Sequence, residues 1–98
     1  MIAWSECDGV WELRMAQPPL NEIGLEMLTA LEHMLDAIES KGARALVVHS
    51  ALDRGFCAGA DLRGLHAAVV GRPAANWLPE LRAFIDRIHR AMDRLDTL

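Results

Sequence analysis

The hexapeptide Phe56-Cys57-Ala58-Gly59-Ala60-Asp61 is the most informative stretch of this chain. It follows an apolar run from Ala43 to His49 and a polar loop, and it leads into a helical pattern that starts near Asp61. Small residues allow a backbone N–H group to come close to a ligand, and a loop that feeds a helix directs such groups outward. An amide placed in this way can stabilise a developing oxyanion. The stretch therefore predicts a ligand-binding loop between a strand and a helix.

The N-terminal residues predict two strands joined by a tight turn. Residues 2–7 and 10–15 flank Asp8-Gly9, a typical two-residue hairpin turn. Apolar and charged residues alternate in the second arm, and this period of two favours a half-buried strand. Gln17-Pro18-Pro19 ends the arm because proline cannot donate to the ladder of a sheet.

A long amphipathic helix is expected next, with Asn21 as its N-cap and Lys41-Gly42 as its stop. Its apolar stripe comprises Ile23, Met27, Leu28, Leu31, Met34, Leu35 and Ile38. The following run from Ala43 to His49 is almost entirely apolar, which is typical of a strand covered on both faces in a parallel sheet. Hairpin, helix and strand together predict an α/β fold in the order ββαβ.

The last third of the chain predicts a short helix, a connection and a second amphipathic helix. The short helix spans Asp61 to Ala68, residues 69–77 connect, and Pro79 suits the first turn of the last helix. The second apolar stripe comprises Leu81, Phe84, Ile85, Ile88, Met92 and Leu95. In a complete domain we expect this stripe to pack on the sheet. Here part of it, and the sheet edge beyond residues 43–49, should lack a cover, which makes the stripe a candidate partner-binding face.

Length and composition exclude several classes of protein. The chain has 98 residues, enough for one small domain, and its formal net charge of −4 argues against nucleic acid or an anionic membrane as partner. No apolar run approaches the roughly 18 residues of a membrane span, and the first residues lack the features of a signal peptide. Cys7 and Cys57 do not make a disulfide framework, so the expected compartment is the cytoplasm.

The order of these segments resembles the N-terminal part of the crotonase (enoyl-CoA hydratase/isomerase) superfamily. The similarity rests on Asp8-Gly9-Val10, Pro18-Pro19-Leu20-Asn21, the long helix, Arg44-Ala45-Leu46-Val47-Val48 and the hexapeptide with Leu62. It covers most of this chain and only the front part of the family's domain. The resemblance implies that residues 1–98 are a single truncated crotonase-like domain. Its expected parts are the hairpin, the amphipathic helix, a buried strand, an oxyanion loop and a C-terminal helix.

The resemblance also implies a function. Crotonase-like proteins bind acyl-CoA thioesters and stabilise a thioester enolate with two backbone N–H groups. By position, Ala60 supplies the first N–H, presented to a cleft, and the backbone of Ala58, Gly59, Ala60, Asp61 and Leu62 lines the CoA pocket.

In the family the second N–H comes from a Gly-Gly-Gly segment, with catalytic glutamates in and beyond it, and this sequence contains no such run. The complete form is therefore expected to act as a hydratase or isomerase of fatty-acid metabolism and to form a homo-oligomer, while this chain alone is inactive. Coenzyme A enters as part of the substrate, and no separate cofactor is expected.

Other residues offer weaker hypotheses. His33, His49, His66 and His89, taken with Cys57, match no zinc-binding spacing, so we expect no metal site. Cys57 has no adjacent base in the sequence, and a small buried thiol is the favoured interpretation. Asp61 is either a catalytic carboxylate or the cap of the following helix, and the cap is favoured.

Arg54 and Arg63 have the chemistry to bind the phosphates of CoA, although exposed loop arginine is the interpretation that we favour. For the chain as a whole, the alternative function is a non-catalytic interaction or assembly module derived from the crotonase fold.

Overall fold

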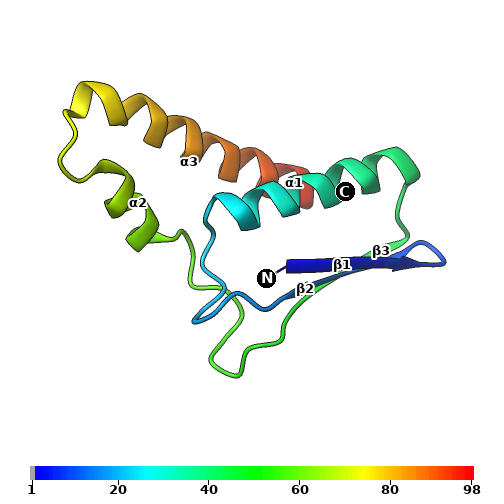
Figure 1. Ribbon diagram of the computed structural model, residues 1–98. Helices are drawn as coiled ribbons and strands as arrows, with labels where there is room; N and C mark the ends of the chain where they lie inside the picture. Colours follow the sequence, from blue (N-terminus) through cyan, green and yellow to red (C-terminus); the bar gives the residue numbers. More distant parts are fainter. Residues whose placement is uncertain (1) are drawn as a thin grey trace.

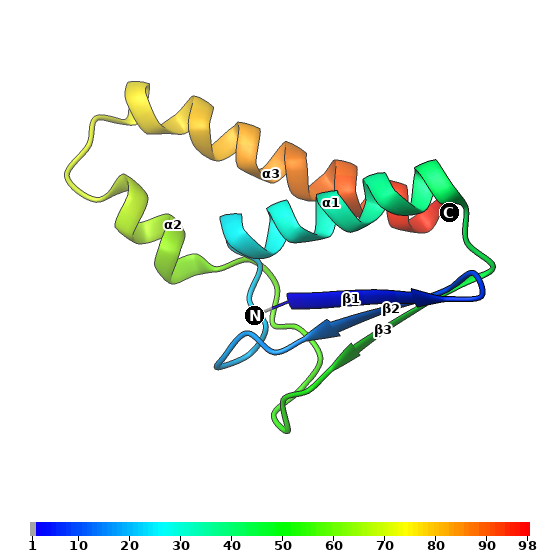
Figure 2. The same ribbon diagram turned by 45° about the vertical axis from the view of Figure 1, so that its right-hand side comes forward.

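The computed structural model describes residues 2–98, which form an α/β fold (Figure 1). The strands are β1 (Ile2–Cys7), β2 (Val10–Met15) and β3 (Ala45–Ser50). The helices are α1 (Leu25–Lys41), α2 (Leu62–Val69) and α3 (Ala74–Asp96). The sheet has the order β1-β2-β3, and Figure 2 shows α1 lying along one of its faces with α3 beside α1.

The predicted hairpin and strand order are confirmed. Asp8 and Gly9 form the turn between β1 and β2, and both have a positive φ (51° and 80°). Positive φ values at both positions are required by the two-residue turn whose twist matches that of the flanking strands. The second hairpin strand then pairs in parallel with β3, with Leu13 opposite Val48. Parallel neighbours need a long crossover, which α1 provides.

The core lies between the sheet and α1. In β2, every second residue is buried, and the three are Trp11, Leu13 and Met15. Six members of the predicted helical stripe are also buried: Met27, Leu28, Leu31, Met34, Leu35 and Ile38. All of them except Met27 belong to one core cluster with Trp11 and Leu13. The indole Nε1 of Trp11 donates a hydrogen bond of 3.1 Å to the carbonyl of Gly42, which fixes the end of α1 over the sheet.

Two predictions about this half of the molecule are wrong. The strand expected to be covered on both faces has one open face, where Val47 is 50% exposed, because no element of residues 2–98 packs on that side. The expected cap Asn21 lies before the helix, which begins at Leu25 with Gly24 as its N-cap residue. Asn21 has a left-handed backbone conformation (φ 54°) in the preceding loop, and its side chain bonds to other segments.

The last helix begins earlier than predicted. Residues 74–77 are helical, so they do not belong to the connection, and Pro79 lies inside the helix instead of in its first turn. Pro73 takes the N-cap position, and its carbonyl accepts hydrogen bonds from the N–H groups of Asn76 and Trp77. These bonds close a first turn that the sequence pattern assigned to the connection.

The apolar stripe of α3 packs on α1 in this structure, and not on the sheet. Phe84 and Ala91 are buried in this contact, and Ile88 is partly buried. Ile85 and Met92 remain 40% and 39% exposed, so part of the stripe is uncovered, as expected.

Two groups of ion pairs reinforce the contact between α1 and α3. Arg87 lies 2.6 Å from Glu32, and Arg94 lies 2.7 Å from both Asp36 and Glu39. The hydrogen bond from Arg87 lowers the pKa of Glu32, and the hydrogen bond from Arg94 lowers the pKa of Glu39.

Candidate functional site

The hexapeptide runs alongside the short segment that precedes α1. The N–H of Ala58 donates to the carbonyl of Leu20 at 3.0 Å. Ile23 then bonds to the loop twice, donating to the carbonyl of Gly59 at 2.7 Å and accepting from the N–H of Asp61 at 2.9 Å. The two stretches therefore form a short ladder that holds the loop in an extended shape.

Ala60 lies where this ladder makes a parallel bridge, opposite Ile23. The Gly59 carbonyl and the Asp61 N–H both point at Ile23, and peptide groups alternate in direction along an extended chain. The N–H of Ala60 therefore points away from Ile23, and it has no hydrogen-bond partner within residues 2–98. Gly59 has a φ of 99° and open space around its Cα, which permits the turn before Ala60. The Ala60 amide is thus left with an unused donor in the described part of the chain.

Asp61 has the structural role that the sequence favoured. Its carboxylate accepts a hydrogen bond of 3.0 Å from the N–H of Gly64, so it caps the N-terminus of α2. A Cβ added at Gly64 would lie 2.7 Å from the same carboxylate, so the glycine leaves the space that the cap needs. This carboxylate is therefore engaged in holding α2.

An apolar cavity of about 450 Å³ opens beside the loop, between α2, α3 and the start of α1. Its apolar walls include Leu25, Leu65, Val69, Trp77, Leu81 and Phe84, and its polar rim comprises Asp61, Glu80 and Arg87. The volume falls within the usual range for small-molecule sites. Of the site residues predicted from the sequence, Asp61 lines this cavity, whereas Ala58, Gly59, Ala60 and Leu62 lie outside its lining.

A salt bridge closes the turn between α2 and α3 at the far end of the cavity. Arg72 binds both oxygens of Glu80, at 2.8 and 2.9 Å, and also donates to the carbonyl of Ala68. The hydrogen bond from Arg72 lowers the pKa of Glu80. Sequence spacing does not reveal this pair, because Arg72 lies across the turn before α3 and outside any helical spacing rule.

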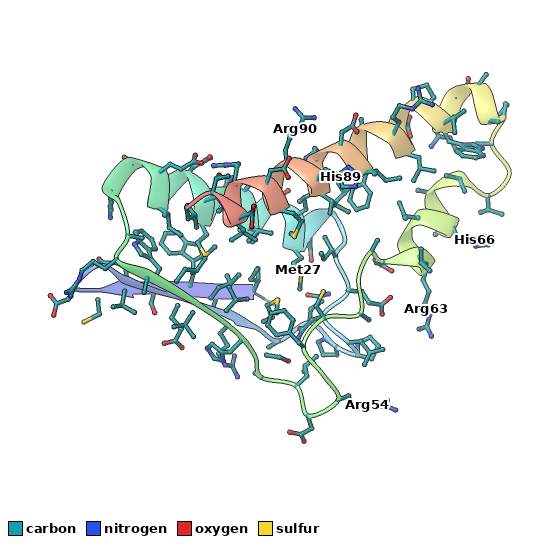
Figure 3. The ribbon with its side chains drawn as sticks, turned by 180° about the vertical axis from the view of Figure 1, so that it is seen from behind. Met27, Arg54, Arg63, His66, His89 and Arg90 are labelled. Carbon is teal, nitrogen blue, oxygen red and sulfur yellow. The ribbon has the colours of Figure 1, made fainter. Side chains whose placement is uncertain are left out.

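Several other candidate residues are scattered over the structure. Figure 3 shows Arg54 at the tip of its loop, Arg63 and His66 on α2, and His89 on α3. Residues 2–98 contain no group of three or more potential metal ligands. Both arginines are exposed and make no ion pair in this part of the chain, so their role toward CoA phosphates stays a hypothesis.

Cys57 is half-buried, and its thiol donates to the carbonyl of Asn21 at 3.2 Å, which fits the structural interpretation of this residue. In the described part of the chain, none of the helices has the length and apolar character needed to cross a bilayer.

Comparisons with known proteins support the fold described above. A family model described as enoyl-CoA hydratase/isomerase matches residues 12–98. The solved structure of Pseudomonas aeruginosa PA4980 is 29% identical over 96% of this chain, with a TM-score of 0.76. An enoyl-CoA hydratase/isomerase family protein from Silicibacter pomeroyi is 27% identical over 93% of the chain, with a TM-score of 0.62.

An enoyl-CoA hydratase from Bacillus anthracis is 22% identical over 95% of the chain with a TM-score of 0.75, which supports the fold. The present chain spans only 38%, 34% and 34% of the length of the Pseudomonas, Silicibacter and Bacillus proteins. Among curated proteins, none shows significant similarity to it.

Proposed function

The chain belongs to the enoyl-CoA hydratase/isomerase family, and from this premise we propose that it binds acyl-CoA thioesters at the hexapeptide loop. The observation that carries the proposal is the free N–H of Ala60, which points away from Ile23 because the carbonyl of the same peptide group, that of Gly59, accepts from Ile23. This N–H is proposed to donate to the thioester oxygen. The backbone of residues 58–62 is proposed to line the position of the CoA.

The chemistry follows from the direction of this amide. When a proton leaves the carbon next to a thioester carbonyl, negative charge develops on the carbonyl oxygen. A fixed N–H at that position stabilises the charge, and one such donor is typically worth about 3–4 kcal/mol. The cavity between α2 and α3 is proposed to take the acyl chain, since its walls are mainly apolar.

The chain alone is expected to bind the thioester without turning it over. Its sequence lacks the Gly-Gly-Gly segment that the family resemblance requires for a second donor, and the carboxylate of Asp61 is engaged as a helix cap. General acid–base chemistry needs a titratable group within about 3 Å of the transferred proton. Hydration of a short 2-enoyl-CoA by the purified chain should therefore be undetectable, and turnover within about tenfold of a complete family enzyme would contradict this.

Binding can be tested with two matched ligands. Butanoyl-CoA carries the thioester oxygen, whereas S-butyl-CoA is the thioether without it. We expect the thioester to bind about 2- to 10-fold more tightly, since a net hydrogen bond is worth about 0.5–1.5 kcal/mol. Its addition should also shift the Ala60 amide signal in ¹H–¹⁵N NMR spectra.

Replacing Ala60 with proline removes the N–H and should make the two ligands bind equally. Circular dichroism must first show that the variant is folded. A folded variant that keeps the preference for the thioester would place the donor elsewhere. In a longer chain that completes the family's fold, the same substitution should cost about two orders of magnitude in turnover.

The alternative function, a non-catalytic interaction or assembly module, predicts no preference for the thioester in any variant. The family match does not favour this alternative. We also propose that the full-length protein is a cytoplasmic homo-oligomer, as the family resemblance implies.

A further inference from the structure

Asn21 is the only polar residue of the described chain that is fully buried, with an exposed fraction of 0%. Its φ of 54° is a left-handed conformation that asparagine tolerates better than most residues. A buried carboxamide is costly unless its hydrogen bonds are made. The partners of Asn21 therefore explain why it is buried at this point.

The side chain of Asn21 joins three segments of the molecule. Its Oδ1 accepts from the N–H of Gln17 in the proline turn at 2.7 Å. Its Nδ2 donates to the hydroxyl of Ser50 at the end of β3 and to the carbonyl of Phe56 at the start of the hexapeptide, both at 2.8 Å. The partners fix the orientation of the carboxamide, because the Gln17 N–H only donates and the Phe56 carbonyl only accepts.

The backbone of Asn21 adds two more bonds. Its N–H donates to the carbonyl of Gln17 at 2.7 Å, and its carbonyl accepts from the thiol of Cys57 at 3.2 Å. The residue therefore holds the first two residues of the hexapeptide, while Ile23 holds the stretch around Ala60. Since its side chain is fully enclosed, Asn21 does not touch a ligand and can influence one only through the segments that it holds.

We propose that Asn21 is a positioning residue: its carboxamide fixes the start of the hexapeptide and thereby the direction of the free Ala60 N–H. This inference rests on the proposed function, in which that N–H meets the thioester oxygen. Binding and catalytic groups need supporting contacts that hold them to within about 0.5 Å. The Phe56 anchor at the start of the hexapeptide and the Ile23 bonds to Gly59 and Asp61, on the two sides of Ala60, supply such support.

The test is Asn21→Asp, which keeps the size of the side chain and places an oxygen where Nδ2 faced the Phe56 carbonyl. In the folded variant, we expect the preference for butanoyl-CoA over S-butyl-CoA to fall to about onefold. The affinity for S-butyl-CoA should change by less than about twofold, which a general loss of structure would not produce. The Ala60 amide signal should also move in the ligand-free protein.

Cys57→Ala is the matched control, because it removes a hydrogen bond to the same residue and leaves the carboxamide contacts intact. It should keep the preference for the thioester. A folded Asn21→Asp variant with an unchanged preference and an unmoved Ala60 signal would overturn the proposal.

Ser50→Ala serves if Asn21→Asp does not fold, since it removes one of the two acceptors of Nδ2. It should give an intermediate preference and a smaller shift of the Ala60 signal, and an unchanged preference and signal would again overturn the proposal. If the unmodified chain itself shows no preference for the thioester, then the proposed function fails. If it shows the preference and the variants keep it, only the role of Asn21 fails.

Discussion

The sheet and α1 are held together by apolar packing, whereas α2 and α3 form an arm held by fewer apolar contacts and several ion pairs. Trp11, Leu28 and Leu35 are fully buried in the first half. In the arm, α2 has no buried residue, and α3 has only Phe84 and Ala91. Figure 1 shows α2 and the start of α3 extending beyond the sheet.

Because of this difference, the half that provides most of the stability is not the half that lines most of the cavity. Regions with few buried contacts open at low free-energy cost, and binding regions are often drawn from them. The cavity lies largely between the two helices of the arm, while the hexapeptide that carries the Ala60 amide is bonded to the segment before α1. A ligand bound at both places would therefore tie the arm to the more stable half.

The largest expected effect is on the free energy of unfolding, and it compares the sheet and α1 directly with the arm. Leu35→Ala should destabilise the protein by about 2–5 kcal/mol, because it leaves a cavity in a fully buried site. Leu81→Ala in the arm should cost less than about 1 kcal/mol, because this side chain lines an open cavity and is only partly buried. Urea denaturation measures both values. Equal losses would show that the halves do not differ as described.

Sequence patterns predicted the first half well because its periodicity is simple. The alternation in β2 and the stripe of α1 both match the buried residues. The open face of β3 was not predictable in this way, since an apolar run such as that around Val47 does not reveal which faces are covered. Whether a face is covered depends on the other elements that pack there.

The site was predicted less completely, for a physical reason. Asn21 carries a local signal for a helix cap, but partners 29 and 35 residues away decide its role. The pair of Arg72 and Glu80 also depends on a tertiary turn. The cap role of Asp61, by contrast, involves a partner three residues away and was predicted. The choice of Ala60 was inferred from the position of its loop between a strand and a helix together with the family resemblance, and its role remains a prediction.

The next effect tests whether the acyl chain binds in the cavity between the helices of the arm. Hexanoyl-CoA has two more methylene groups than butanoyl-CoA and should bind up to about 15-fold more tightly, at about 0.8 kcal/mol for each buried methylene. Ala68→Phe should reduce this gain, because Ala68 lines the cavity. The neighbouring Ala67 does not, so Ala67→Phe is the matched control. Calorimetric titration measures the affinities, and an equal effect of the two variants would contradict the assignment.

A smaller effect is expected within α2. Alanine normally stabilises a helix by about 0.8–1 kcal/mol relative to glycine. At Gly64 this gain should be largely cancelled, because the new Cβ would displace the Asp61 carboxylate and cost up to the roughly 1 kcal/mol of a cap. Amide hydrogen exchange in α2 and global unfolding should therefore both barely change. In an Asp61→Ala background, Gly64→Ala should slow the exchange clearly, and an equal effect in the two backgrounds would contradict the proposed crowding.

The smallest effect is the pH dependence of the contact between α1 and α3. The hydrogen bond from Arg87 lowers the pKa of Glu32 in the folded protein from its ordinary value of 4.5. A lowered folded pKa means that the pair stabilises the fold above about 4.5 and that this contribution is lost as the pH falls through the folded pKa. The two side chains are 27% and 34% exposed, so solvent screening limits the effect to a few tenths of a kcal/mol.

Hydrogen exchange along α3 tests this pH dependence against the behaviour of the core. After correction for the intrinsic dependence of exchange on pH, protection of α3 should fall between pH 6 and pH 3.5, while the amides of β2 keep theirs. Glu32→Gln removes the charge and should reduce the change. Glu26→Gln is the control, because Glu26 lies on the same helix and makes no ion pair within residues 2–98. If protection falls equally in α3 and β2, acid weakens the whole fold, and the ion pairs do not distinguish the arm from the core.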